Sequence, residues 1–140
     1  MPNDKVFEVV YLSEIDKNIE RFVKKKKFRK LPGQIEELEY KLSNGEFNEP
    51  PIWRSDYPVP YDVYKIRMPN LDANEGKSNG YRVIYAVVAR EPISIVVLIT
   101  VYYKKEQVSV TETYIKGLID GFFLESAPYD ENAEEIDKDE

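Results

Sequence analysis

The sequence predicts an α+β fold in which an N-terminal strand and an αα-hairpin pack on a small antiparallel sheet, followed by a C-terminal helix. Three observations predict it: two amphipathic stretches lie near the N-terminus, three apolar or alternating runs follow, and a further amphipathic stretch closes the chain. The chain has 140 residues, of which 42% are hydrophobic. That length is typical of one domain, which we place at residues 1–128.

The first strand and helix follow from residue type and periodicity. Residues 6–11 are rich in β-branched and aromatic side chains, which favours a strand. Ser13 has a side chain suited to a helix N-cap, with Asp16 three positions on as a weaker capping-box partner. Apolar residues at helical spacing then continue, so we expect this helix to end near Lys27.

A second helix and a long loop come next. Pro32 suits the first turn of a helix over residues 31–44, and Gly45 suits the position just past its end. Residues 45–61 then carry four prolines, which favours a long loop without regular structure.

Three strands and a closing helix complete the predicted fold. Side chains alternate between two faces in residues 62–68, and three of them are expected to pack against the helices. These three are Tyr64, Ile66 and Met68. The runs 81–89 and 93–103 are mostly apolar, as is typical of central strands. Residues 111–124 show the spacing of an amphipathic helix.

The composition excludes several classes of chemistry. The chain has neither cysteine nor histidine, so disulfides, thiolate metal sites, cysteine nucleophiles and histidine-containing triads are excluded. The N-terminus lacks the apolar region of a signal peptide, and the longest apolar run, residues 95–103, is about half the ~20 residues of a membrane span. We therefore expect a soluble, cytoplasmic protein with no membrane partner.

The acidic net charge resides in one segment. Residues 129–140 hold seven acidic residues and one basic residue, so they carry all of the net charge of −6, and residues 1–128 are neutral. We expect this acidic tail to be disordered, because it has little apolar surface to bury. It either covers a basic face of the domain or is an inert solubilising segment. The acidity of the chain therefore does not exclude a polyanionic partner.

Basic side chains fall on all three predicted central strands. Lys65 and Arg67 are two residues apart and share one face, Arg82 begins the next strand, and Lys104 and Lys105 follow the last. A single such charge is usually a solvated surface residue. Neighbouring strands lie only about 5 Å apart, however, so the set predicts a cationic site for a polyanion. A second basic run, residues 24–30, is either another RNA contact or a solvated helix end.

Three segments carry a resemblance to a known family. They read VYKIR at 63–67, GKSNGYRVIY at 76–85 and VLITVYYKK at 97–105. Together they resemble the RelE/ParE toxin superfamily, in particular its HigB-like and RelE-like mRNA interferase branch, over about residues 62–123. The resemblance implies a RelE-like fold and a type II toxin–antitoxin toxin, a ribosome-dependent endoribonuclease that cleaves mRNA during translation. It also implies a cognate antitoxin, the ribosome and mRNA as partners, and no metal or organic cofactor.

RNA cleavage by its own 2′-hydroxyl assigns roles to these cations. The reaction needs a proton acceptor, charge stabilisation at phosphorus and a proton donor for the leaving 5′-oxygen. Without histidine, a lysine amine is the candidate base, and neighbouring cations favour its neutral form. We assign Lys65 as the base, Arg67 and Arg82 as phosphate stabilisers, and Lys104 as acid or stabiliser, at positions that match basic residues of the family. The candidate RNA-binding residues are Lys77, Tyr102, Tyr103 and Lys105.

One departure from the family leaves other functions open. Some RelE-like members use a tyrosine near the C-terminal helix, where this chain has Val110 or Thr111, with Tyr114 nearby. A ParE-like toxin that inhibits DNA gyrase by binding would need no such group. A non-toxic, domesticated member of the same fold is the third possibility.

Overall fold

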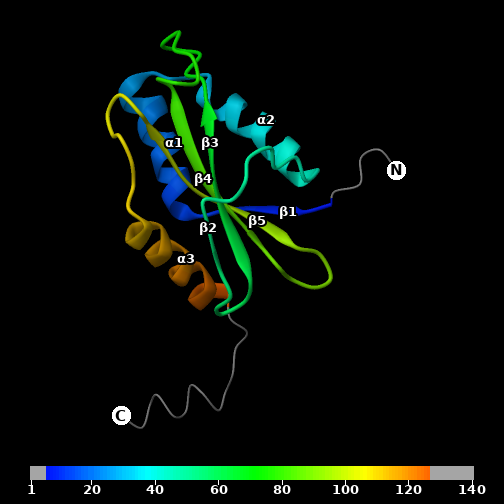
Figure 1. Cartoon of the computed structure of the whole chain (residues 1–140). Coiled ribbons are helices and arrows are strands. Elements are labelled where there is room, and N and C mark those ends of the chain that lie inside the picture. Colours follow the sequence, from blue (N-terminus) through cyan, green and yellow to red (C-terminus); the bar gives the residue numbers. More distant parts are fainter. Residues whose placement is uncertain (1–5, 127–140) are drawn as a thin grey trace.

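The computed structural model describes residues 6–126, which form three helices and a five-stranded mixed sheet (Figure 1). The α+β class predicted from the sequence is confirmed. The predicted acidic tail lies outside the described residues. In chain order the elements are β1 (Glu8–Tyr11), α1 (Ser13–Lys26), α2 (Leu31–Ser43), β2 (Trp53–Ser55), β3 (Tyr61–Met68), β4 (Tyr81–Val88), β5 (Ile95–Tyr103) and α3 (Glu112–Ser126).

The sheet has the strand order β1-β5-β4-β3-β2. Strands β2 to β5 pair antiparallel, but β1 lies parallel to β5, with Glu8 opposite Ile95 and Tyr11 opposite Leu98. The three predicted central strands pair antiparallel as expected, but the sheet as a whole is mixed, because β1 joins it in the parallel direction. A hairpin turn forces antiparallel pairing, whereas β1 is joined to the sheet through a helical connection that leaves the parallel direction open.

The segment 45–61 also differs from its prediction as a loop without regular structure. Its residues Trp53–Ser55 form β2, which pairs with Val63–Tyr61 at the edge of the sheet. Prolines at 51 and 58 flank this strand but do not interrupt it, and the Ile52 N–H donates to the Val63 carbonyl at 2.7 Å. Proline is tolerated beside an edge strand, so the proline count alone misled the prediction.

The helix ends confirm part of the capping pattern. Ser13 is the first residue of α1 and not its N-cap, because the Leu12 N–H still donates to the Leu98 carbonyl and holds Leu12 extended in the N-cap position. No side chain caps this end. At α2, Pro32 lies in the first turn as predicted, and Gly45 follows the C-cap with a φ of 81°, in the left-handed region that favours glycine.

Helices cover the two faces of the sheet unequally (Figure 1). α1 and α2 pack over one face, where Tyr64 and Met68 are buried as predicted and Ile66 is half-buried. α3 packs on the opposite face and buries Ile115 and Ile119 against a second apolar cluster. It covers that face near the start of β3, and the end of β3 that carries Lys65 and Arg67 stays exposed. No helix within residues 6–126 is long and apolar enough to cross a lipid bilayer.

Candidate functional site

The strand register brings three of the predicted cations together. Arg67 lies opposite Arg82, which lies opposite Tyr102, so these three side chains form one row across β3, β4 and β5. Lys65 belongs to the next row on the same face. Lys65 and Arg67 are exposed, and neither forms an ion pair with an acidic residue of the described chain.

Arg82 differs from its neighbours because it is buried, with 4% of its surface exposed. Its guanidinium donates to the carbonyl oxygens of Lys77 at 2.8 Å, Ser78 at 3.1 Å and Tyr81 at 3.2 Å. Burial, and then the nearby charge of Arg67, lower the pKa of this guanidinium. Arg82 is thus engaged with the loop at 76–80, which favours a positioning role and leaves Arg67 as the exposed cation of the row.

Gly80 fixes the same loop against the end of β3. A Cβ at this position would lie 2.3 Å from the Met68 carbonyl oxygen and 2.9 Å from the Asn70 nitrogen, so only glycine fits between the two segments. A Cβ at Gly76 would meet nothing within 4 Å. Of the two glycines in the GKSNG segment, only Gly80 is required by packing.

The remaining predicted lysines lie farther along the sheet. The Lys104 N–H donates to the Gly80 carbonyl at 2.9 Å, so Lys104 follows the row of Arg82 and Tyr102. Lys65 and Lys104 are therefore separated by two strands and two same-face rows, about 10 Å across and about 14 Å along the sheet. Lys105 instead forms an ion pair with Glu75 at 2.9 Å.

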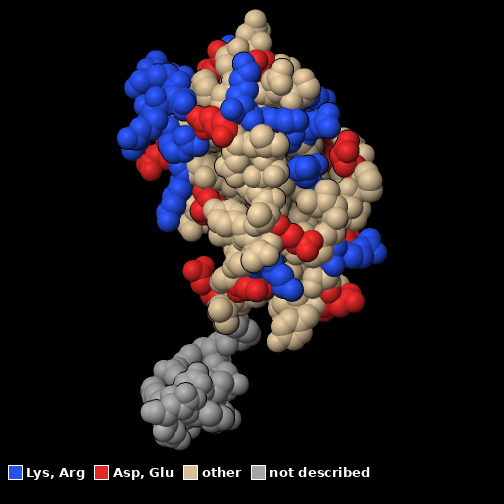
Figure 2. Space-filling view, turned by 60° about the vertical axis from the view of Figure 1, so that its left-hand side comes forward, with Lys and Arg blue, Asp and Glu red and all other residues tan. Residues whose placement is uncertain are grey.

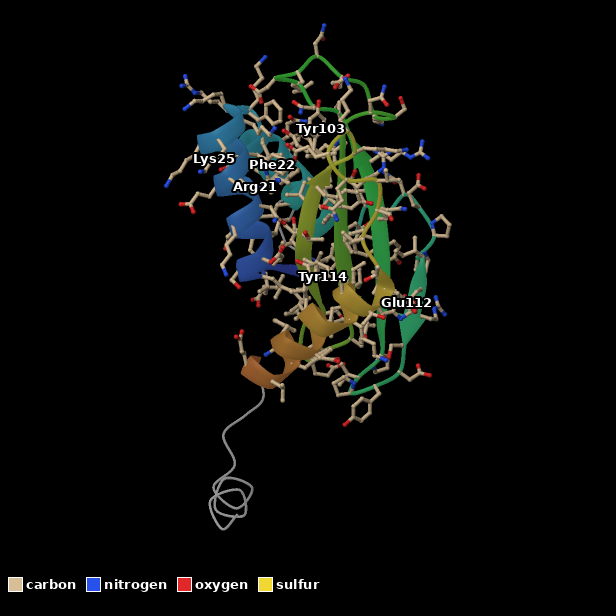
Figure 3. All side chains as sticks on the ribbon, turned by 90° about the vertical axis from the view of Figure 1, so that its left-hand side faces the viewer. Arg21, Phe22, Lys25, Tyr103, Glu112 and Tyr114 are labelled. Atoms are coloured by element: carbon tan, nitrogen blue, oxygen red, sulfur yellow. The ribbon has the colours of Figure 1, made fainter. Side chains whose placement is uncertain are left out.

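The two predicted RNA-binding tyrosines face opposite sides of the sheet. Tyr102 lies beside Arg82 and is 4% exposed, whereas Tyr103 packs against Phe28 on the α1–α2 side and is 8% exposed. Figure 3 shows Tyr103 at the end of the sheet, below the loop that joins β3 to β4. Burial and a 2.6 Å hydrogen bond to Glu75 raise the pKa of Tyr103 to about 12. Neither ring presents a free face for stacking on a base.

The same end of the molecule carries a second cationic group that the sheet analysis did not include. Four exposed cations of the last turn of α1 and the link to α2 form no ion pair with the acids of residues 6–126. They are Lys25, Lys27, Arg29 and Lys30. Figure 2 shows Lys and Arg side chains gathered over this half of the molecule, and Figure 3 shows Lys25 on the outer side of α1. We refer to these four residues with Lys65, Arg67, Lys77 and Lys104 as the basic end.

A polar groove of about 290 Å³ lies beside Tyr102, between α1 and the segment that leads into α3. Within it the Tyr114 hydroxyl donates to Glu14 at 2.7 Å, and this bond, followed by burial, raises the pKa of Tyr114 to about 12. The sequence offers Tyr114 as a candidate, but its spacing gives no sign of a partner 100 positions away. Among residues 6–126, no three histidine, cysteine, aspartate or glutamate side chains gather as a metal site would require.

Comparison with known proteins finds no matching family model, no significantly similar curated protein and no significantly similar solved structure.

Proposed function

We propose that this chain is a type II toxin with a RelE-like fold, a ribosome-dependent endoribonuclease that holds mRNA on its basic end. The observation that carries the proposal is the adjacency of Lys65 and Arg67, two exposed cations on a part of the sheet whose α3-side face is not covered by any helix of residues 6–126. The element order of one strand, two helices, further strands and a final helix agrees with the fold that the family resemblance implies.

Charge supports an anionic ligand at this position. Like charges repel, and the cations of the basic end form no ion pair with the acids of the described chain. Lys65 and Arg67 lie about 7 Å apart along β3 and share one face of the sheet. A phosphate backbone supplies closely spaced negative charges and gains affinity by releasing its counterions.

The proposed reaction uses the RNA 2′-hydroxyl as the nucleophile. Lys65 is the proposed base that takes the 2′-hydroxyl proton, and the 2′-oxygen forms a bond to the adjacent phosphorus while Arg67 donates hydrogen bonds to the non-bridging oxygens. The bond from phosphorus to the 5′-oxygen then breaks. Once the 5′-oxygen has taken a proton, the products are a 2′,3′-cyclic phosphate and a 5′-hydroxyl end.

The distance between Lys65 and Lys104 decides whether both can act on the same phosphate, and therefore whether the reaction needs a proton donor from the ribosome. Lys104 stands too far from Lys65 to protonate the oxygen that leaves the same phosphorus, so we assign it to a neighbouring phosphate. The Arg82 guanidinium already donates hydrogen bonds to the carbonyl oxygens of Lys77 and Ser78, so it is not assigned as the proton donor. The described chain thus supplies a base and an anion clamp but no dedicated proton donor opposite Lys65. A reaction that proceeds only on the ribosome, where RNA groups or ordered water can supply this proton, is consistent with that geometry.

The test is mRNA cleavage in a reconstituted translation system, with 5′ ends mapped by primer extension. Lys65→Ala is expected to lower the cleavage rate about 10²-fold or more, and Arg67→Ala by a similar factor. Lys116→Ala, which removes an exposed cation from α3, is the matched control and should leave the rate unchanged. Full activity in the Lys65→Ala/Arg67→Ala double variant would overturn the assignment. Absence of cleavage together with gyrase inhibition would favour the non-catalytic alternative.

A further inference from the structure

The outer edge of β3 is covered over only part of its length. β3 spans Tyr61–Met68, but β2 pairs with residues 61–63 alone. The Val63 carbonyl accepts from the Ile52 N–H, one residue before β2, so the polar groups of Val63 point towards the outer edge. The period of two places the N–H and C=O groups of Lys65 and Arg67 on the same side. No hydrogen bond joins these backbone groups to another described residue. We call this part of β3 the open edge; its unpaired N–H and C=O groups can pair with an additional strand.

The opposite side of the sheet shows how the chain closes an edge of this kind. β1 pairs with β5 only as far as Leu98, so the rest of β5 is also free of a neighbouring strand. There the Asn18 side chain from α1 accepts from the Val101 N–H at 3.1 Å and from the Thr100 hydroxyl at 2.7 Å. No described side chain closes the edge at Lys65 and Arg67 in this way.

A groove runs beside the open edge, on the side of the sheet that α2 covers. It has a volume of about 330 Å³ and lies between α2, the end of β3 and the following loop. Apolar side chains make up part of its lining; these are Leu38, Ile66, Met68, Pro69 and Leu71. A strand added to β3 would direct every second side chain into this groove.

The other face of an added strand would meet different chemistry. Its remaining side chains would lie on the side of Lys65 and Arg67, where acidic residues fit best. A second copy of the chain is a poor occupant, because pairing two β3 edges would bring the Lys65 and Arg67 side chains of both copies close together. Charge therefore favours a partner of a different sequence.

We propose that the open edge of β3 docks an extended segment of a partner protein, one that alternates acidic with apolar residues. Main-chain hydrogen bonds to Lys65 and Arg67 supply part of the affinity, and the α2 groove with the two cations supplies the specificity. The inference depends on the open edge and the groove, and it holds whether or not the chain cleaves RNA.

The test uses a seven-residue peptide, Val-Glu-Val-Glu-Val-Glu-Val, titrated into the full chain without RNA and followed by NMR chemical shifts up to millimolar concentration. Two N-methylated versions separate edge pairing from charge attraction, because each blocks the N–H groups on one side of the peptide strand. The version methylated on the side that faces β3 should lose affinity about tenfold or more. The version methylated on the opposite side should bind as the unmodified peptide does. Replacing each glutamate by lysine should also weaken binding at least tenfold.

Several outcomes would overturn the proposal. Equal binding of both N-methylated peptides would exclude strand pairing, and absence of binding by the parent peptide would exclude the site. Shifts confined to residues away from β3 and α2 would do the same. A dimer in sedimentation that dissociates on Lys65→Glu substitution would instead assign the edge to a second copy. The peptides leave the protein sequence unchanged, so none of the peptide results depends on whether a variant folds.

Discussion

The two glycines of the GKSNG segment allow a sharp test of how the loop is fastened to the sheet. Gly80→Ala places a methyl group where a Cβ would lie 2.3 Å from the Met68 carbonyl oxygen, 2.9 Å from the Asn70 nitrogen and 2.9 Å from the Gly76 carbonyl oxygen. All three are backbone atoms, so no side chain can rotate away to make room. The loop or the end of β3 must move instead.

The magnitude follows from the cost of overpacking. Insertion of a group into a filled space usually costs 1–3 kcal/mol, and a contact with three backbone atoms belongs at the upper end, about 2–3 kcal/mol. For a domain of this size that free energy corresponds to a drop in Tm of roughly 8 °C. Gly76→Ala is the matched control, because its Cβ would lie in open space and its φ is not in the left-handed region. It should change stability by less than about 0.5 kcal/mol, or stabilise slightly.

Thermal unfolding gives the Tm of each variant, and urea unfolding gives its free energy of unfolding. Both can be followed by the fluorescence of Trp53, the one tryptophan of the sequence. Equal Tm values for the two variants would refute the argument that Gly80 is fixed by close backbone contact. A larger drop in Tm for Gly76→Ala than for Gly80→Ala would refute it more strongly, because the steric constraint would then lie at Gly76 and not at Gly80.

Two further predictions concern side chains at the same end of the sheet. Arg82→Met removes three hydrogen bonds from a charged donor and should cost about 2–4 kcal/mol in urea unfolding, while Arg67→Met, at an exposed position, should cost under about 0.5 kcal/mol. The Tyr103 hydrogen bond, and then that of Lys105, lower the pKa of Glu75. A lowered carboxylate pKa stabilises the fold at pH values above the ordinary pKa of about 4.3, and this stabilisation is lost as the pH falls through the native pKa. Tyr103→Phe should therefore reduce stability at pH 7, but much less at a pH low enough to protonate Glu75 in the folded protein. An equal difference between wild type and Tyr103→Phe at both pH values would contradict this linkage.

The fold was predictable where one local pattern decided the outcome. Alternation in residues 62–68 assigned Tyr64 and Met68 to the helix side and Lys65 and Arg67 to the other, and the structure agrees. The parallel direction of β1 was not predictable in this way, because it depends on the path of the helical connection. The strand β2 was hidden by the neighbouring prolines, which determine where a strand can begin and end but not whether one forms.

The candidate site was less predictable because side chains choose partners through the tertiary structure. Sequence spacing placed Arg82 on the cationic face but could not show that its guanidinium turns to the carbonyl oxygens of the 76–80 loop. Tyr103 and Lys105 likewise both contact Glu75, a residue of the loop between β3 and β4. The basic end gathers cations from four separate segments, which only the folded chain brings to the same end of the molecule.

The central claim is that Lys65 and Arg67 contact an RNA backbone, and the salt dependence of RNA affinity tests it most directly. A fluorescently labelled single-stranded RNA should bind the wild-type chain with a slope of log K against log salt of about −0.7 for each phosphate contacted. The Lys65→Ala/Arg67→Ala double variant should bind more weakly, with a slope less steep by about 1.4, the contribution of two phosphates. A Lys17→Ala/Lys116→Ala control removes the same charge from exposed positions on the two helices and should keep the wild-type slope. An unchanged slope and affinity in the Lys65→Ala/Arg67→Ala variant would contradict the claim that this face of the sheet holds RNA.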